Sequence, residues 1–198
     1  CIQIAFMIIT VIANHRGLDD AAAVGIVEKV ISALFIVPSS MLATVSALSA
    51  QNFGAGKPKR AAGILRYATV ITCVYGLIVT VVAEFTAERI LGIFTADAIV
   101  ILAGSQYIRG YILDTIVAGI HFSFSGFFCA CEKSYIGFLH NMLAIVLIRV
   151  PGSYFASILF PDTLFPMGLA APAGSLLSVI ICIAAYRWLK RQGVIPDR

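Results

Sequence analysis

The sequence predicts an all-α membrane protein with six transmembrane helices, on the basis of its composition and the length of its apolar runs. Of the 198 residues, 60% are apolar and 12% are charged, whereas a soluble domain carries about 25% charged residues. The stretches 30–51 and 163–186 contain no charge, and each reaches the roughly 20 residues that a helix needs to cross a bilayer. Because these runs do not alternate polar and apolar residues, we expect helices and not the strands of a β-barrel.

The six helices are expected between connectors that contain polar residues, glycine or proline. Their approximate ranges are 1–14, 21–50, 61–85, 97–130, 134–158 and 165–188. The chain begins with Cys1 inside an apolar run, so we expect a first helix that is cut short and a chain that is a fragment. The fourth segment is longer than one span needs, and its first two turns are expected at the membrane interface. Pro38 and Pro151 are expected to kink the second and fifth helices.

Lysine and arginine are distributed unequally between the two ends of these helices. The loops after the first, third and fifth helices hold Arg16 and Arg89. The loops after the second, fourth and sixth helices hold Lys57, Lys59, Arg60, Lys133, Arg187, Lys190, Arg191 and Arg198. Basic loops stay in the cytoplasm. The loops after the second and fourth helices and the C-terminus are therefore expected on the cytoplasmic side of a plasma membrane. This topology accounts for the net charge of +4 without nucleic-acid binding.

Several kinds of chemistry find no support in the sequence. The five cysteines lie mostly in apolar runs and are expected to be small core residues. The pair Cys129 and Cys131 has no histidine or second cysteine pair beside it, so no metal site is expected. Three dispersed histidines give no catalytic constellation, and neither an enzyme nor an organic cofactor is expected. The stretch 54–57 lacks the flanking glycine and hydroxyl residue of a nucleotide-binding loop.

The loop after the second helix suggests a family. The segment 48–57 (LSAQNFGAGK), followed by Arg60 and Ala61, resembles a loop of the multidrug and toxic compound extrusion (MATE) family. Its characteristic residues are Gln51, Asn52, Gly54, Gly56, Lys57 and Arg60. Two later segments agree: 149–151 (RVP) with Tyr154 resembles the penultimate helix of one bacterial subgroup, and 168–172 (GLAAP) resembles the start of the last helix.

The resemblance covers essentially the whole chain and implies a fold and a function. Residues 1–198 would form the C-terminal six-helix lobe of a two-lobed (6+6) transporter, facing a missing N-terminal lobe across a central cavity. The protein would be a multi-pass bacterial membrane protein among lipids, exporting small amphipathic organic cations or drugs in exchange for H⁺ or Na⁺. Two alternatives stay open: a flippase for lipid-linked precursors, disfavoured by the few membrane bases (Lys29 and Arg149), and a non-transporting fragment.

The ionisable residues within the apolar runs are the candidates for function. At 100° per residue, one stripe of the fourth helix is polar. It contains the candidate cavity-lining residues Tyr107, Tyr111, His121 and Ser125 together with Asp114. Asp114 and Arg149 lie at similar depth, about 18 and 15 residues from the turn that joins their helices. They could form a structural ion pair, or Asp114 could bind the coupling cation with Arg149 as its charge partner.

The resemblance also implies cation coupling for carboxylates in the matching helices, which here are Asp114 and Glu28. Glu28 is adjacent to Lys29, so the two side chains point about 100° apart on their helix. Snorkelling toward the membrane surface explains Lys29 as well as a function does. His121 could relay protons or could simply pack between helices.

Overall fold

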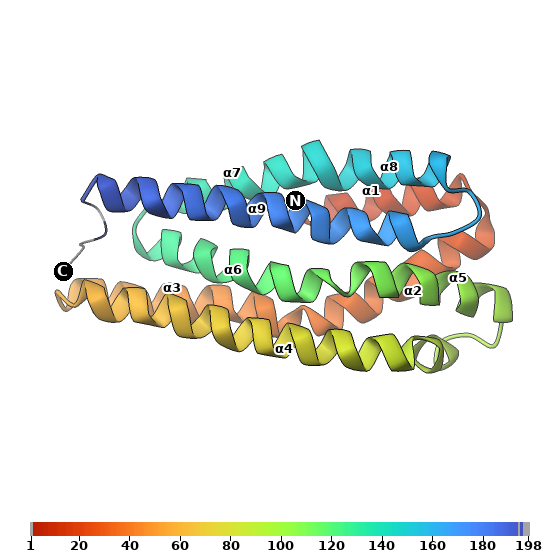
Figure 1. The fold of residues 1–198 in the computed structure, drawn as a ribbon, viewed down its shortest axis with the longest axis horizontal. Helices are drawn as coiled ribbons and strands as arrows, with labels where there is room; N and C mark the ends of the chain where they lie inside the picture. The colour runs from red at the N-terminus through yellow and green to blue at the C-terminus, as the bar shows by residue number, and fades with distance from the viewer. Residues whose placement is uncertain (1, 194, 196–198) are drawn as a thin grey trace.

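The computed structural model describes residues 2–193 and 195, so Cys1 and Arg198 lie outside the described residues. The helices group into six rods that run along one long axis (Figure 1). They are α1 (Ile2–Asn14), α2 (Leu18–Leu34) with α3 (Ile36–Gly54), α4 (Pro58–Gly92), α5 (Ala98–Tyr111) with α6 (Asp114–Ala130), α7 (Ser134–Ala144) with the π-helix η1 (Ile145–Arg149) and α8 (Val150–Leu159), and α9 (Phe165–Arg191).

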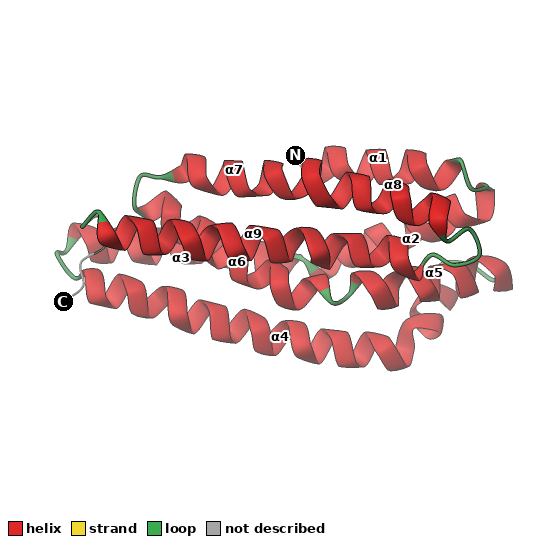
Figure 2. Ribbon diagram, turned by 45° about the horizontal axis from the view of Figure 1, so that its top comes forward, coloured by secondary structure: helices red, strands yellow, loops and turns green. Residues whose placement is uncertain are grey.

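The connections alternate between the two ends of this bundle. The α3–α4 turn, the α6–α7 turn and the end of α9 lie at one end, at the left of Figure 1. The connections α1–α2, α4–α5 and α8–α9 lie at the other end, and helices and loops make up all the described parts of the ribbon in Figure 2. The connections rich in lysine and arginine therefore lie together at the end of the α3–α4 turn. The connections with few basic residues lie together at the opposite end.

The prediction of an all-α membrane fold is confirmed. Among the described residues, four helices are long and apolar enough to cross a membrane, and α5 with α6 makes a fifth span when the bent pair counts as one. The first helix, α1, has 13 residues and is shorter than a span. Several rods extend beyond the expected ranges: α4 continues to Gly92, α9 continues to Arg191, and the rod of α2 and α3 runs from Leu18 to Gly54.

The segment 97–130, expected as one helix, requires a correction. It consists of α5 and α6, which are bent by 43° relative to each other at Ile112 and Leu113. The expected polar stripe is still buried on both pieces: the exposed fractions of Tyr107, Tyr111, Asp114, His121 and Ser125 are all 4% or less.

Proline accounts for the break between α2 and α3. Pro38 has no N–H and therefore cannot donate to the carbonyl of Leu34, four residues earlier. The helix ends at Leu34 and restarts at Ile36. The hydroxyl of Tyr75, from α4, donates to the Leu34 carbonyl at 2.9 Å instead. The expected irregularity at Pro151 takes the form of the π-helix η1, which ends two residues before the proline.

Glycines allow the central helices to approach closely. A Cβ at Gly126 of α6 would lie 2.3 Å from the carbonyl oxygen of Leu42 in α3, and a Cβ at Gly168 of α9 would lie 2.4 Å from that of Tyr107 in α5. Both distances are well below van der Waals contact. These two contacts bring α6 against α3 and α5 against α9. The span made of α5 and α6 therefore lies in the middle of the bundle.

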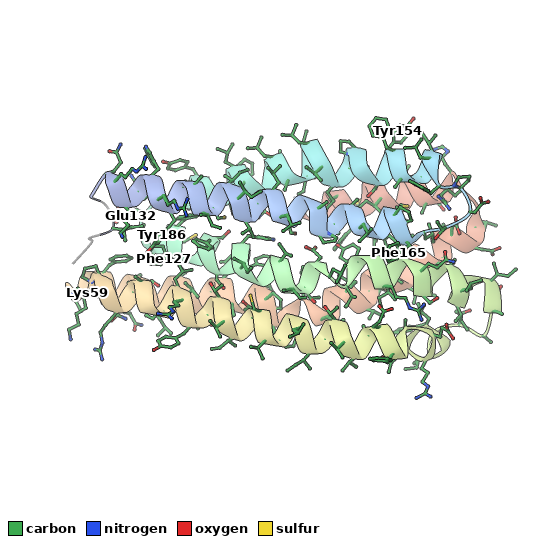
Figure 3. All side chains as sticks on the ribbon, viewed as in Figure 1. Lys59, Phe127, Glu132, Tyr154, Phe165 and Tyr186 are labelled. Atoms are coloured by element: carbon green, nitrogen blue, oxygen red, sulfur yellow. The ribbon has the colours of Figure 1, made fainter. Side chains whose placement is uncertain are left out.

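Two apolar clusters fill the bundle, one toward each end. One contains Tyr107, Tyr111 and their neighbours from α1, α2, α4 and α9, and the other contains Phe127 and its neighbours from α3, α4, α7 and α9. The rings of Phe127 and Tyr186 meet in the second cluster at 5.7 Å, near the end where Lys59 and Glu132 project (Figure 3). Large apolar side chains also cover the outside of α4 and α8, as a lipid-facing surface requires.

Arg16 joins the connections at the opposite end. Its guanidinium pairs with Asp20 at 2.7 Å and donates to the carbonyl oxygens of Ser157, Phe160 and Pro161 at 2.7 to 3.1 Å. These carbonyls belong to the last turn of α8 and the residues after it, whose acceptors have no intrahelical donors. The first connection of the chain is thereby fixed to the last one.

Candidate cation site at the break between α5 and α6

The bend between α5 and α6 makes Asp114 the first residue of α6 and buries it completely. Arg149 reaches it from the last position of η1, and its Nη2 donates to Oδ2 of Asp114 in a buried ion pair. The two residues that the sequence places at similar depth are therefore in contact. Removing either partner would leave an uncompensated charge in a medium of low dielectric constant.

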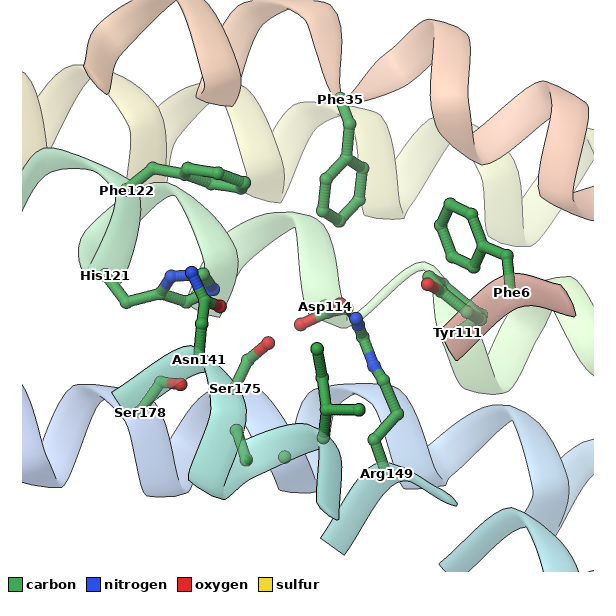
Figure 4. Close-up of a pocket in the computed structure, with 13 residues that line it drawn as sticks. Phe6, Phe35, Tyr111, Asp114, His121, Phe122, Asn141, Arg149, Ser175 and Ser178 are labelled. Atoms are coloured by element: carbon green, nitrogen blue, oxygen red, sulfur yellow. Dashed lines mark hydrogen bonds and ion pairs between the residues drawn. The ribbon is translucent and has the colours of Figure 1, made fainter. Parts of the chain in front are cut away.

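A small cavity of about 20 Å³ lies beside this ion pair. This space is sufficient for about one water molecule. The cavity is bounded by the ion pair, by Tyr111, by Ser175 of α9 and by His121 (Figure 4). Figure 4 shows the Ser175 hydroxyl pointing toward the Asp114 carboxylate. Its remaining walls are mainly aromatic and aliphatic, so the polar groups are concentrated around Asp114.

Two buried tyrosines extend the site along α5. The rings of Tyr107 and Tyr111 lie 5.7 Å apart, and the guanidinium carbon of Arg149 lies 5.6 Å from the centre of the Tyr111 ring. This distance allows a cation–π interaction, which helps to hold the arginine in a region without water. Arg149 therefore contacts an anionic group and an aromatic face.

Two histidines lie on the other side of the cavity. The His121 ring stacks on Phe122 at 4.8 Å and meets the His140 ring edge-on at 5.6 Å. Oγ of Ser125 donates to the His121 carbonyl at 2.8 Å and lies 2.8 Å from Nε2 of His140. Because the single Ser125 hydrogen goes to the carbonyl, Nε2 of His140 carries the proton in that second bond.

Glu28 lies outside this cavity. It occupies an open groove between α1 and α2, where Thr10 donates to its Oε2 at 3.1 Å. Phe6 lines both the groove and the cavity beside the ion pair. Lys29 is exposed on the same groove. The structure thus brings Asp114, Arg149, Tyr111 and His121 together around one cavity and places Glu28 in the neighbouring groove.

The loop motif is distant from this site and forms a turn. Asn52 donates from its side chain to the Leu48 carbonyl at 2.8 Å, and the Lys57 amide donates to the Asn52 carbonyl at 2.8 Å. Gly56 has φ +67°, a left-handed conformation that favours glycine. Gln51, Gly54, Lys57 and Arg60 are exposed. In this lobe the motif ends α3 and starts α4.

Sequence reasoning missed several residues of the site. Ser175 and Ser178 of α9 and Asn141 of α7 line the cavity, and Phe6 and Thr10 belong to the short first helix. The one available signal was the spacing of Ser175 and Ser178, which puts two hydroxyls on one face of an apolar helix. His140 was not among the candidate site residues, and its ring contacts that of His121.

Comparisons with known proteins agree on one family. The sequence profile of the MatE family matches residues 1–155. A protein of Shewanella oneidensis described as an FAD transporter is 26% identical over 183 residues, which are 90% of this chain and 39% of that protein. The lobe also resembles a mutant of the MATE transporter VcmN from Vibrio cholerae (TM-score 0.88, 15% identity, 96% of this chain and 43% of that one).

A structure described as the inward-facing conformation of a multidrug resistance MATE family transporter is similar as well. The TM-score is 0.84 at 14% identity, over 94% of this chain and 42% of that one. At such identities the solved structures establish the fold. The chain spans about two fifths of the length of the relatives it matches.

Proposed function

Since this chain belongs to the MatE family of multi-pass membrane transporters, we propose that it forms one lobe of a cation-coupled antiporter. In this proposal an inward gradient of H⁺ or Na⁺ drives export of amphipathic organic cations by alternating access. The lobe works against a second six-helix lobe, with which it encloses the substrate cavity. The end that holds the loop motif and the end of α9 faces the cytoplasm of a bacterial plasma membrane, because that end carries the excess of lysine and arginine.

The observation that carries the proposal is the environment of Asp114. A carboxylate in the middle of a membrane bundle costs free energy, and proteins retain one mainly where it pairs or works. One oxygen of Asp114 accepts from Arg149, while Oδ1 has no hydrogen-bond partner among the described residues. That second oxygen lies next to a cavity with room for about one water molecule. The arrangement is suited to reversible binding of a cation, because uptake of H⁺ or Na⁺ would change the charge of the Asp114–Arg149 pair.

A flavin dinucleotide is a second candidate substrate. The relative described as an FAD transporter matches 90% of this chain, and a substrate of that kind carries phosphate anions. Arginine binds phosphate well, and Arg149 and Lys29 are the bases near the cavity and the groove. Export of FAD would use the same coupling site and a different substrate contact.

Transport by the protein produced from its complete reading frame, in proteoliposomes, tests the proposal. A pH gradient or a Na⁺ gradient would be imposed, and export of ethidium or of FAD would be followed by fluorescence. We expect one of the two gradients to drive transport, and Asp114→Asn to abolish it. Asp19→Asn, which changes an exposed acid of α2, is the matched control and should behave as wild type.

The outcomes separate the possibilities. Gradient-driven transport by Asp114→Asn at the wild-type rate would exclude Asp114 as the coupling group. If that variant instead fails to fold, the ion pair is primarily structural. Preference for ethidium or for FAD decides between the two substrates, and transport of neither under either gradient contradicts the proposal.

A further inference from the structure

The outer face of α4 carries an apolar band with a charged residue at each of its ends. In Figures 1 and 2, α4 forms one edge of the bundle, and α1 and α8 form the opposite edge. Between Arg66 and Glu84, every exposed side chain of α4 is aliphatic apart from that of Tyr67. These about 18 residues of helix span about 27 Å, which matches the hydrocarbon thickness of about 30 Å in a bilayer. Arg66 and Glu84 therefore mark the two boundaries of the hydrocarbon region.

The protein supplies a counter-charge at one of these boundaries and not at the other. At the end near α5, the carboxylates of Glu84 and Glu88 lie 3.6 and 3.8 Å from the guanidinium of Arg109. At the opposite end Arg66 is exposed, and no hydrogen bond or ion pair joins its guanidinium to another described residue. A charged side chain at the edge of the hydrocarbon region is stabilised by pairing or by reaching the headgroups. The partner of Arg66 is therefore water or a lipid group.

The charge around Arg66 is positive. Residues 52–83 contain no aspartate or glutamate, and their four basic residues are Lys57, Lys59, Arg60 and Arg66. Glu132 lies at the same end in the α6–α7 turn, where Lys133 follows it, so that pair adds no net charge. Basic residues at a membrane surface attract anionic lipids. A zwitterionic headgroup carries a positive group as well as its phosphate and gains less from this excess of base.

Three residues of α4 leave room for one phosphate. Lys59, Gly63 and Arg66 are spaced by four and three residues, so they lie on one stripe of the helix. A Cβ at Gly63 would meet no atom of the described residues within 4 Å, and the space between the two basic side chains is therefore open. Helical side chains lean toward the N-terminus of their helix, which directs Arg66 over Gly63 toward Lys59. Figure 3 shows Lys59 projecting away from the bundle at this end.

The same stripe continues into the hydrocarbon region as an apolar track. Val70, Val74 and Leu77 follow Arg66 at helical spacing, and all three are exposed. An acyl chain attached to a phosphate at Gly63 would lie along these side chains. The occupant that fits both parts of the stripe is a phospholipid, because a free phosphate would leave the apolar part uncovered.

We propose that Lys59, Gly63 and Arg66 form a binding site for one anionic phospholipid on the outer face of α4. The Arg66 guanidinium donates to two oxygens of the phosphate, since its planar fork matches them. The Lys59 ammonium adds a second positive charge, and Gly63 lets the phosphate approach the helix. The site lies on the edge opposite α1, and it depends neither on the coupling ion nor on the substrate of the proposed transport.

Photo-crosslinking in vesicles tests this site with the protein from the complete reading frame. The photoreactive residue p-benzoylphenylalanine replaces Tyr67, which is exposed and adjacent to Arg66. The vesicles contain equal amounts of phosphatidylglycerol and phosphatidylcholine with the same acyl chains, and mass spectrometry gives the ratio of the two lipid adducts. We expect phosphatidylglycerol to predominate. With the photoreactive residue in place of Phe85 instead, at the opposite end of the apolar band, the two adducts should form equally.

Variants separate a site from a diffuse attraction. Arg66→Gln should lower the adduct ratio by about fivefold, the usual effect of one basic residue near an anionic membrane surface. Gly63→Leu should lower it as well, because the side chain fills the open space without changing any charge. Arg187→Gln removes an exposed arginine of α9 at the same end of the bundle and should leave the ratio unchanged.

Three results would overturn the proposal. Equal adducts of the two lipids next to Arg66 would show no preference for an anionic lipid. Equal losses in Arg66→Gln and Arg187→Gln would show a diffuse attraction to the basic end. Loss of the preference on addition of glycerol 3-phosphate would show that the residues take a phosphate without acyl chains. If Arg66→Gln does not fold, Gly63→Leu decides, because it keeps every charge in place.

Discussion

The hydroxyl of Tyr75 donates a hydrogen bond to the carbonyl of Leu34, the backbone acceptor that Pro38 cannot serve. The tyrosine comes from α4 and the carbonyl from the end of α2, so a contact between two rods satisfies a defect within one of them. In the hydrocarbon region water cannot take this role, and an unpaired carbonyl there costs several kcal/mol by general estimates. The break between α2 and α3 and the position of Tyr75 therefore depend on each other.

Tyr75→Phe is expected to lower the free energy of unfolding by about 1–3 kcal/mol, because the Leu34 carbonyl loses its donor while the ring is kept. The measurement is the thermal midpoint of the purified protein in detergent. Tyr67→Phe, at an exposed position on the same helix, should leave the midpoint unchanged. Equal midpoints for Tyr75→Phe and wild type would show that the carbonyl finds another donor.

Gly126→Ala is expected to destabilise the lobe by about 1–3 kcal/mol, because a Cβ at this position would overlap the backbone of α3 and force the helices apart. The distance to the Leu42 oxygen would be 2.3 Å. Gly63→Ala is the control, since a Cβ there meets no atom of the described residues within 4 Å. Comparison of folded yield and thermal midpoint of the two variants checks this, and an unaffected Gly126→Ala protein would mean that α3 and α6 pack less closely than described.

The thiol of Cys131, in the turn between α6 and α7, is expected to react slowly at neutral pH. Burial raises its pKa to about 11, although nearby Lys133 acts in the opposite direction. Well below that value the reactive thiolate increases about tenfold for each pH unit. In a Cys129→Ser background, alkylation of Cys131 by N-ethylmaleimide should therefore accelerate about tenfold per unit between about pH 7 and 9. Mass spectrometry of the labelled peptide gives the rate, and a rate that levels off near pH 8 would contradict the shift.

Arg16→Gln is expected to cost about 2 kcal/mol, since several carbonyl oxygens at the end of α8 lose a charged donor. Proteolysis at the α8–α9 connection should become faster, because that loop loses its attachment to the α1–α2 connection. Arg89→Gln, at an exposed position of α4, serves as the control. Unchanged cleavage of Arg16→Gln would show that the two connections are held by other contacts.

Composition and hydrophobic runs were sufficient to predict the fold class, and the proline at position 38 indicated where one rod breaks. The break between α5 and α6 was not predictable in the same way. The residues there are Ile112 and Leu113, which suit a continuous apolar helix and give no local signal for a break. The close approach of Gly168 to the Tyr107 carbonyl near the bend joins residues that are far apart in the chain.

The candidate site was predicted in part for a similar reason. Periodicity on one helix placed Tyr111, Asp114 and His121 on the same face, and a shared depth suggested Arg149 as a neighbour. Contributions from α1 and α9 could not be derived, because the packing of helices that are not adjacent in sequence decides which faces meet. Glu28 illustrates the limit: its position in the chain is clear, but its place in a groove apart from the cavity beside Asp114 is a property of the assembled bundle.

Three rods depart from regular α-helical geometry where they border the same cavity. Phe35 lies at the α2–α3 break, Asp114 begins α6 after the bend, and Arg149 ends the π-helix, and all three line that space. The two apolar clusters lie on either side of this level. Of the long rods described, only α4 and α9 run unbroken past this level, and both contribute to the two clusters. The irregular turns of the other three rods are therefore gathered around Asp114, while the continuous rods hold the two clusters together.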